Sequence, residues 1–187
     1  MSFRSLRVAS LAAILAAVLT LSARAQSTKP AAAAAGAASA TATLLDAKGA
    51  EVGKVTLTQA GSDVKVHVDV KGLTAGPHGF HIHTVGSCTA PDFKDAGGHY
   101  NPTNKKHGKD NPEGPHEGDL PNLEVKADGT GSMDFTIAGA SLSGTDTSIL
   151  DKDGGAAVVH AKADDFKTDP SGNSGDRIAC GVIKAGA

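Results

Sequence analysis

Residues 63–70 carry the clearest folding signal in this chain, because valine alternates with polar side chains throughout the segment. Successive side chains of an extended strand point to opposite faces, so this alternation is typical of a half-buried antiparallel strand. Related patterns occur in seven further segments: 41–47, 51–58, 79–84, 123–127, 132–137, 156–161 and 178–183. Turn-forming residues separate several of them, and no segment has a convincing helical period. The pattern predicts an all-β fold, a sandwich or barrel of eight strands.

Two long segments, residues 85–122 and residues 162–177, lack this alternating strand pattern. The first contains five prolines and many glycines and asparagines. Loops of this length in a compact domain are usually functional, and they need something to order them. We therefore expect these two loops to carry functional residues.

The N-terminal region is predicted to lie outside the folded domain. Arg4 and Arg7 precede an apolar run at residues 8–21, and Ala23-Arg24-Ala25 places small residues where a signal peptidase cuts. Residues 1–25 are therefore interpreted as a secretory signal peptide. The alternative is a membrane anchor, for which the run is too short, since a spanning helix needs about 20 apolar residues. The alanine-rich residues 26–40 are expected to form a flexible spacer, and residues 41–187 are expected to form one domain.

The charge balance says little about large partners. The whole chain has 18 basic and 20 acidic residues. Loss of Arg4, Arg7 and Arg24 with the signal peptide leaves 15 basic residues against 20 acidic ones, a formal charge of −5. The sequence has no evident basic face for nucleic acid or, after signal cleavage, for a membrane. The negative net charge does not exclude a small anionic substrate, because the local charge around a site matters more than the net charge of the chain.

The chain contains two cysteines, Cys88 and Cys180. An exported protein meets an oxidising compartment, so two cysteines suggest one disulfide. In the chain-entropy view, closing a loop of this size is worth about 4–5 kcal/mol. The alternative interpretation is a pair of buried free thiols.

Six of the eight histidines, together with one aspartate, form a candidate metal constellation. His81 and His83 flank Ile82 in a predicted strand, so both imidazoles project from the same face. His160 follows the apolar run 156–159. The remaining candidates lie in the first long loop: His99, His107, His116 and Asp119. The other two histidines, His67 and His78, are interpreted as solvated and structural respectively.

Ligand chemistry divides this constellation into two sites. Three histidines with one aspartate are typical of a closed structural zinc site, and an all-imidazole set suits copper. Seven ligands fill two four-coordinate sites only if one imidazole is shared through both of its nitrogens. His99 is the natural candidate for that bridge, because it lies between the strand pair and the other loop ligands. Spacing alone does not demonstrate the bridge.

These residues resemble the copper-zinc superoxide dismutases, and within them the bacterial exported type. The resemblance covers the chain from about residue 41 to its end. The matching segments are Gly79-Phe80-His81-Ile82-His83, Gly97-Gly98-His99-Tyr100-Asn101-Pro102, His107-Gly108, Gly114-Pro115-His116-Glu117-Gly118-Asp119-Leu120, Val158-Val159-His160-Ala161-Lys162-Ala163-Asp164-Asp165 and Gly172-Asn173-Ser174-Gly175-Asp176-Arg177-Ile178-Ala179-Cys180-Gly181-Val182-Ile183. The resemblance implies an eight-stranded Greek-key β-barrel, and this family is a known example of the β-sandwich architecture.

The resemblance also implies a role for each site residue. The implied copper ligands are His81, His83, His99 and His160. The implied zinc ligands are His99, His107, His116 and Asp119, with His99 as the bridge. Cys88 and Cys180 match the family's disulfide, Arg177 matches the active-site arginine, and Asp164 matches a carboxylate that links a copper histidine to a zinc histidine. Tyr100 is a mild departure, since many relatives have phenylalanine there.

The activity implied is conversion of two superoxide anions and two protons to dioxygen and hydrogen peroxide by redox cycling of copper. Arg177 would dock the anion, and His99 would carry a proton. Candidate steering charges are Lys105, Lys106, Lys109, Lys162 and Lys167, for most of which a solvated loop lysine is the alternative. The protein would be periplasmic or secreted, with a homodimer possible. Rival interpretations are an exported copper or zinc carrier without catalysis and a two-zinc hydrolase, although the ligand set has only one carboxylate.

Overall fold

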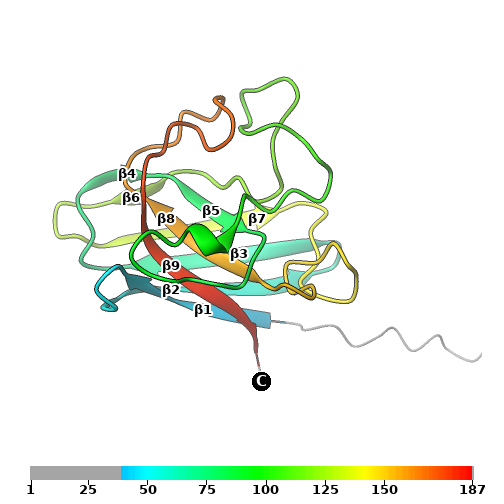
Figure 1. Ribbon diagram of the computed structural model, residues 1–187, viewed down its shortest axis with the longest axis horizontal. Helices are drawn as coiled ribbons and strands as arrows, with labels where there is room; N and C mark the ends of the chain where they lie inside the picture. Colours follow the sequence, from blue (N-terminus) through cyan, green and yellow to red (C-terminus); the bar gives the residue numbers. More distant parts are fainter. Residues whose placement is uncertain (1–38, 187) are drawn as a thin grey trace, which may run out of the picture. The chain divides into compact units, whose positions relative to one another are not determined.

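The computed structural model describes residues 39–186, and the predicted signal peptide with most of the predicted spacer lies outside them (Figure 1). The elements along the chain are β1 (Ser39–Asp46), β2 (Glu51–Ala60), β3 (Asp63–Val70), β4 (Gly76–His78), β5 (Phe80–His83), the 3-10 turn η1 (Lys94–Ala96), β6 (Leu123–Val125), β7 (Gly131–Ile137), β8 (Gly155–His160) and β9 (Arg177–Ala185). The expected all-β fold is confirmed. Within the described range, no helical segment has the length and apolarity needed to cross a bilayer.

Seven strands form one antiparallel sheet in the order β5-β8-β9-β1-β2-β3-β7, and β4 pairs with β6 in a second, two-stranded sheet. After β3 the chain crosses to the opposite edge of the large sheet as β5, and after β7 it crosses again to lie beside β5 as β8. These crossovers are of the Greek-key kind. Each of the eight expected strands has a counterpart, and the additional strand, β4, has only three residues. Figure 1 shows the large sheet curling around its inner face.

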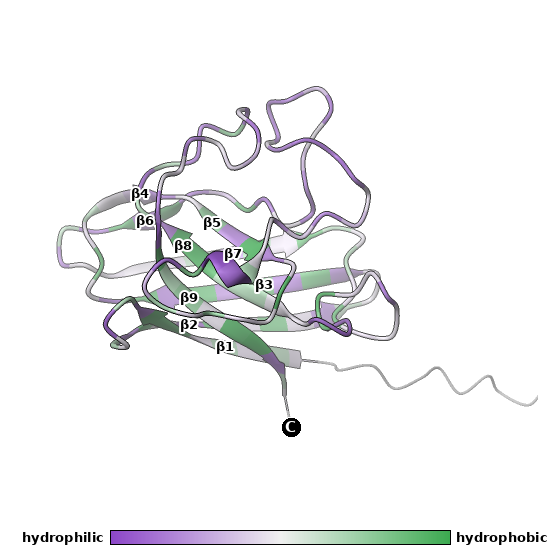
Figure 2. Cartoon of the chain, in the orientation of Figure 1, coloured by the Kyte–Doolittle hydropathy of each residue, from purple (hydrophilic) through white to green (hydrophobic). Residues whose placement is uncertain are grey.

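The core follows the alternation seen in the sequence. Val64, Val66, Val68 and Val70 are buried, whereas the polar residues between them face outward. The same inner face collects larger side chains from other strands, including Leu44, Leu57, Phe80 and Ile82. Fully burying one such side chain stabilises the fold by about 1.5–3 kcal/mol. Figure 2 shows hydrophobic residues recurring along the strands and hydrophilic residues along much of the long loops.

Strand β1 begins two residues before the expected start of the domain. Ala40, which the sequence placed in the spacer, is fully buried and pairs with Leu57 of β2 and Ala185 of β9. The reason is that Ala40 continues the inward-facing series of Ala42 and Leu44. Alanine is only weakly hydrophobic, so the alternation is hard to detect at this end of the strand. In sequence, this part of β1 resembles the alanine-rich segment before it.

The two long loops lie together over one end of the barrel (Figure 1). The backbone N–H of Asp110 in the first loop donates to the Phe166 carbonyl in the second, at 2.9 Å. The backbone N–H of His107 donates to the Asp169 carboxylate at 2.6 Å. The Lys109 ammonium lies 4.6 Å from the centre of the Phe166 ring, within the range of a cation–π contact. Each loop therefore helps to order the other.

We predict that His67 makes folding stability depend on pH. Its ring nitrogens lie 2.9 Å from a carboxylate oxygen of Asp134 on β7 and 2.9 Å from one of Asp69 on β3. The hydrogen bond with Asp134, followed by that with Asp69, raises the pKa of His67 above 6.5. A raised pKa means that the folded protein binds this proton more tightly than the unfolded chain does. The added stability is therefore complete below the unfolded pKa and is lost as the pH rises through the folded pKa.

The measurement is urea unfolding of the native protein and of His67→Gln, in the same metal state, at about pH 5.5 and about pH 8.5. We expect the native protein to be more stable than the variant at the lower pH and the difference to shrink at the higher pH. A stability difference that is the same at both values would contradict the prediction.

Candidate metal centre

Strands β5 and β8 and the first long loop bring four imidazoles together. His81 and His83 lie on β5 and alternate with Phe80 and Ile82, which enter the main core. His160 ends β8, the strand that pairs with β5. His99 reaches the group because the first long loop returns to pair with β5, opposite His83. All four side chains are buried.

One nitrogen of each ring in this group has no hydrogen-bond partner within residues 39–186. These atoms are His81 Nδ1, His83 Nε2, His99 Nε2 and His160 Nε2. The four histidines offer ligand atoms that lie within 4.8 Å of one another. A buried polar atom without a partner costs about 1–3 kcal/mol. A single cation bound to all four nitrogens would remove that cost, and an all-imidazole set suits copper.

Burial keeps these rings in the form that binds metal. It lowers the pKa of His81 to about 3 and that of His160 to about 4. Burial also lowers the pKa of His83 and of His99. A neutral imidazole has a free lone pair on one nitrogen, as a metal ligand requires.

The opposite nitrogen of three of these rings is held by a hydrogen bond. His81 Nε2 donates to the Asp164 carboxylate at 2.7 Å, His83 Nδ1 to the Gly97 carbonyl at 3.0 Å, and His160 Nδ1 to the Gly175 carbonyl at 3.1 Å. These bonds fix the tautomer and the orientation of each ring.

A second group shares His99 and adds three loop residues, His107, His116 and Asp119. Asp119 Oδ1 lies 2.7 Å from His99 Nδ1, 3.0 Å from His107 Nδ1 and 3.1 Å from His116 Nδ1. The other carboxylate oxygen accepts the backbone N–H groups of Gly108 and His116. This set of three imidazoles and one carboxylate matches a closed tetrahedral zinc shell. Both expected groups are therefore brought together, and the two nitrogens of His99 face different groups.

Asp164 lies between the two groups, where the family resemblance implied a linking carboxylate. Its Oδ2 accepts from His81 Nε2 at 2.7 Å, and its Oδ1 lies 2.9 Å from His107 Nε2. The side chain is fully buried. Burial raises the pKa of this carboxyl, but hydrogen bonds with His107 and His81 outweigh burial and leave the pKa well below its usual value. Asp164 is therefore an ionised acceptor for one ring of each group.

Arg177 lies at the start of β9 and is held by main-chain oxygens. Its guanidinium donates to the Phe93 carbonyl and to the Gly97 carbonyl, each at 2.7 Å. These bonds place it beside His83, which shares the Gly97 oxygen. Asp169, a nearby carboxylate of the second loop, pairs with Lys106 instead of Arg177.

A small cavity of about 310 Å³ adjoins both histidine groups. Its lining residues are Gly98, His99, Asn101, His116, Pro170, Ser171 and Arg177. Arg177 is the one permanently charged cation in this lining, and none of the five candidate steering lysines belongs to it. Arg177 also lines a wider outer hollow of about 500 Å³, together with Lys94 and Asp92.

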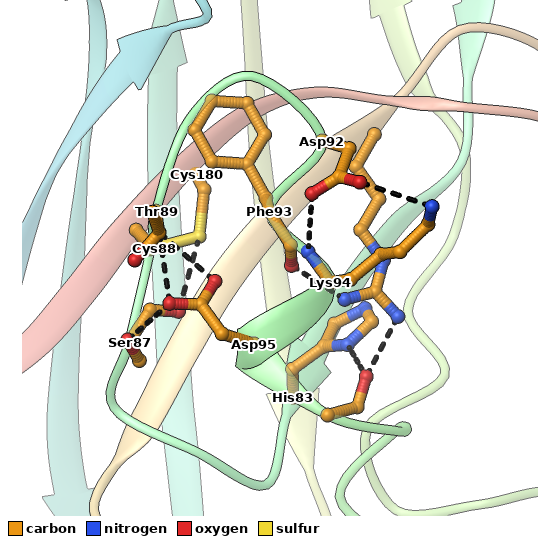
Figure 3. The surroundings of a disulfide bond; sticks show 11 residues. His83, Ser87, Cys88, Thr89, Asp92, Phe93, Lys94, Asp95 and Cys180 are labelled. Carbon is orange, nitrogen blue, oxygen red and sulfur yellow. Dashed lines mark hydrogen bonds and ion pairs between the residues drawn. A yellow bond between two sulfur atoms is a disulfide. The ribbon is translucent and has the colours of Figure 1, made fainter.

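The loop that presents these carbonyls is tied down by the disulfide between Cys88 and Cys180 (Figure 3). The Asp95 carboxylate accepts hydrogen bonds from the Ser87 hydroxyl and from the Thr89 backbone N–H, on either side of Cys88. Phe93 has a left-handed backbone, with φ 53°, and its buried ring packs in the cluster that includes Cys180. The predicted disulfide is therefore present, and it fixes the segment from which Arg177 is held.

Sequence reasoning missed the supporting roles of Phe93, Gly97 and Gly175, because each acts through its main-chain carbonyl. It interpreted His78 as structural, and the buried His78 ring does lie 2.7 Å from the His160 carbonyl and 2.9 Å from the Thr74 carbonyl. His67 is exposed on the outer face of the sheet, away from both groups.

The comparisons with known proteins agree with this geometry. The family model described as Copper/zinc superoxide dismutase (SODC) matches residues 51–183. The chain is 46% identical over 143 residues to the superoxide dismutase-like protein YojM of Bacillus subtilis, covering 75% of this chain and 73% of that protein. It is 43% identical over 145 residues to superoxide dismutase [Cu-Zn] 1 of Aquifex aeolicus, covering 76% and 86%. It is 38% identical to superoxide dismutase [Cu-Zn] of Deinococcus radiodurans, covering 98% of each.

Solved structures show the same fold. A crystal structure of a SOD-like protein from Bacillus subtilis aligns with a TM-score of 0.72 and 44% identity, covering 75% of this chain and 95% of that one. The clock protein EA4 aligns with a TM-score of 0.67 and 36% identity, covering 79% and 94%.

We predict that Asp164→Ala weakens copper retention more than it weakens the fold. The substitution removes the acceptor that orients His81, and loss of such a partner typically costs about 10–100-fold in metal affinity. Copper affinity is measured by competition with a chelator, and thermal unfolding of the metal-free, disulfide-bonded protein is measured beside it. The control is Asp165→Ala, because that neighbouring carboxylate binds Thr168 and Asn173 rather than a histidine. Unchanged copper affinity in Asp164→Ala would contradict the prediction.

Proposed function

The chain belongs to the copper/zinc superoxide dismutase family, and we propose on that basis that it is an exported enzyme that removes superoxide. The net reaction converts two superoxide anions and two protons to one dioxygen and one hydrogen peroxide. The observation that carries the proposal is the group of four buried imidazoles beside a small cavity lined by a fixed guanidinium. Each imidazole has one nitrogen without a hydrogen-bond partner among residues 39–186.

The proposal divides the ligands between two ions. His81, His83, His99 and His160 hold copper, and His99, His107, His116 and Asp119 hold zinc, with His99 shared. Copper in this site supplies one-electron redox chemistry, and zinc orders the first long loop. The division is supported by the chemistry of the two donor sets, since only the second contains a carboxylate.

Arg177 would attract and orient the substrate. A guanidinium is charged at every physiological pH and has five N–H donors in a planar fork. Main-chain carbonyls occupy two of these directions at 2.7 Å, which leaves donors for a small anion. Because Arg177 is the one permanently charged side chain of the 310 Å³ cavity, it would add to the attraction that bound metal ions exert on an anion there.

His99 is the proposed proton carrier. Its Nε2 has no hydrogen-bond partner among the described residues, and its Nδ1 lies 2.7 Å from Asp119. Because His99 also lines the adjoining cavity, a proton held at Nε2 would lie close to a peroxide formed there. Zinc held together with Asp119 would keep the ring in place.

Export is supported by the apolar N-terminal run and by the disulfide. A bond between Cys88 and Cys180 is typical of oxidising compartments such as the periplasm or the extracellular space. The proposed location is therefore periplasmic or secreted, after removal of residues 1–25.

A second candidate function is copper or zinc carriage without catalysis. It is favoured by one finding, that a relative of 46% identity is named only as superoxide dismutase-like. The fixed position of Arg177 beside the cavity argues against it, because a metal carrier needs no docking site for an anion.

The test is superoxide removal by the disulfide-bonded protein with both metals, compared with protein that holds zinc alone. We expect rapid turnover in the first sample and none in the second. The rate should approach the diffusional ceiling of about 10⁸–10⁹ M⁻¹s⁻¹, for which superoxide dismutases are a known example. Protein that retains copper in the histidine site but fails to remove superoxide would support the carrier instead.

We predict that Arg177→Ala lowers kcat/KM for superoxide about tenfold or more and weakens its dependence on ionic strength, because a charged site raises the association rate by about 10–10³-fold. Copper content should stay near one ion per chain. Arg177→Lys is the matched control: it keeps the charge and should recover part of the rate, but not the planar fork. An Arg177→Ala variant with full copper and an undiminished rate would show that Arg177 has no role in docking.

A further inference from the structure

The side chain of Asn122, in the first long loop, is hydrogen-bonded to the backbone of Asp164 in the second. Its side-chain N–H₂ donates to the Asp164 carbonyl at 3.0 Å, and its side-chain oxygen accepts the Asp164 backbone N–H at 2.7 Å. Both polar groups of the Asn122 amide are thus hydrogen-bonded to the backbone of Asp164. Asn122 is the last residue of the first loop, three residues after Asp119, and Asp164 belongs to the second loop.

The carboxylate of Asp164 is confined from two further directions. The Phe166 backbone N–H donates to its Oδ1 at 2.6 Å. Gly172 lies against it so closely that a Cβ on Gly172 would stand 1.8 Å from Asp164 Oδ1 and 2.7 Å from His107 Nε2. Only glycine fits at this position, which also has a left-handed backbone with φ +64°. These contacts therefore fix the position of the Asp164 carboxylate.

We propose that Asn122 is a positioning residue that couples the copper and zinc sites by holding Asp164 still. Asp164 bonds His81 of the first group and His107 of the second. If the Asp164 carboxylate could shift, it would follow a movement of the His81 ring without changing the position of the His107 ring, and the reverse. A fixed carboxylate transmits a change at either ring, so occupancy of one site alters affinity at the other, and thermodynamic linkage makes the effect reciprocal.

The inference rests on the division of ligands proposed above, and it concerns metal binding rather than turnover. The amide of Asn122 suits the role because it offers one donor and one acceptor in the spacing of a backbone pair. Aspartate at this position would lose the donor, and alanine would lose both groups.

The experiment measures the affinity of the mature, disulfide-bonded chain for Cu(II), with and without Zn(II), in the native protein and in Asn122→Ala. The electron paramagnetic resonance spectrum at one equivalent of copper identifies which site is filled. The ratio of the two affinities is the coupling. We expect bound zinc to change the copper affinity of the native protein. In Asn122→Ala, we expect the ratio of the two affinities to be about tenfold closer to one. Loss of a hydrogen-bond partner behind a metal ligand costs about 10–100-fold in metal affinity, and the expected change is at the lower end of that range.

Asn111→Ala is the matched control. The Asn111 amide also joins the two loops, donating to the Lys167 carbonyl at 3.3 Å and accepting the Glu113 backbone N–H at 3.0 Å, but neither bond involves Asp164. Its coupling should equal that of the native protein. Native coupling in Asn122→Ala, or an equal loss in Asn111→Ala, would overturn the inference.

Gly172→Ala provides a second variant, which displaces the carboxylate and leaves Asn122 in place. Because its Cβ also approaches His107 Nε2, the Zn(II) affinity of this variant is measured separately and the coupling is compared at full zinc occupancy. We expect it to lose coupling as Asn122→Ala does. If Asn122→Ala fails to fold, Gly172→Ala alone decides, and native coupling in it overturns the inference. The same measurements separate this inference from the proposed function. A native protein that does not hold copper in the four-histidine site would contradict the function, whereas an effect of zinc on copper affinity that is the same in the native protein and in Asn122→Ala would contradict only the role of Asn122.

Discussion

The concentration of six imidazoles and two carboxylates in one water-excluded volume is the constraint on which the rest of this structure depends. The rings of His81 and His99 have centroids only 4.0 Å apart, and all six rings are buried. Charged imidazoles could not be packed in this way without strong repulsion. The arrangement is stable only if most rings stay neutral and each nitrogen has either a hydrogen-bond partner or a metal ion. The barrel, the loops and the disulfide all serve to hold the rings in that arrangement.

Strands and loops contribute differently to this arrangement. His81, His83 and His160 sit on paired strands, so the main sheet fixes them without help from metal. The other ligands sit on a loop that has little secondary structure of its own. That loop is ordered by contacts with the second loop and by Asp119, whose carboxylate faces three rings at once. Bound zinc would therefore matter most to loop order, and the strand histidines would matter most to the geometry of the copper site.

The residue types and their spacing made much of the fold and the ligand set predictable. Alternation at residues 63–70 indicated the burial of four valines, and the spacing of His81 and His83 placed them on one face. The positions that could not be predicted act through the main chain or through shape. Phe93 and Gly97 hold Arg177 by carbonyl oxygens, which every residue has. Asn122 and Gly172 enclose Asp164 through contacts across distant segments, and a lone asparagine or glycine gives no sign of such contacts.

The use of carbonyl oxygens to hold Arg177 has a consequence for how the disulfide loop can vary. A carbonyl acceptor is the same whatever side chain its residue carries, so exposed positions such as Asp92 and Lys94 can be substituted without removing either acceptor. A change in the path of the loop is different. The Gly97 oxygen serves both Arg177 and His83, so an insertion or deletion that moves it would displace the anion dock and a metal ligand together. This loop should therefore tolerate side-chain substitutions at exposed positions, but not changes in its backbone path or its length.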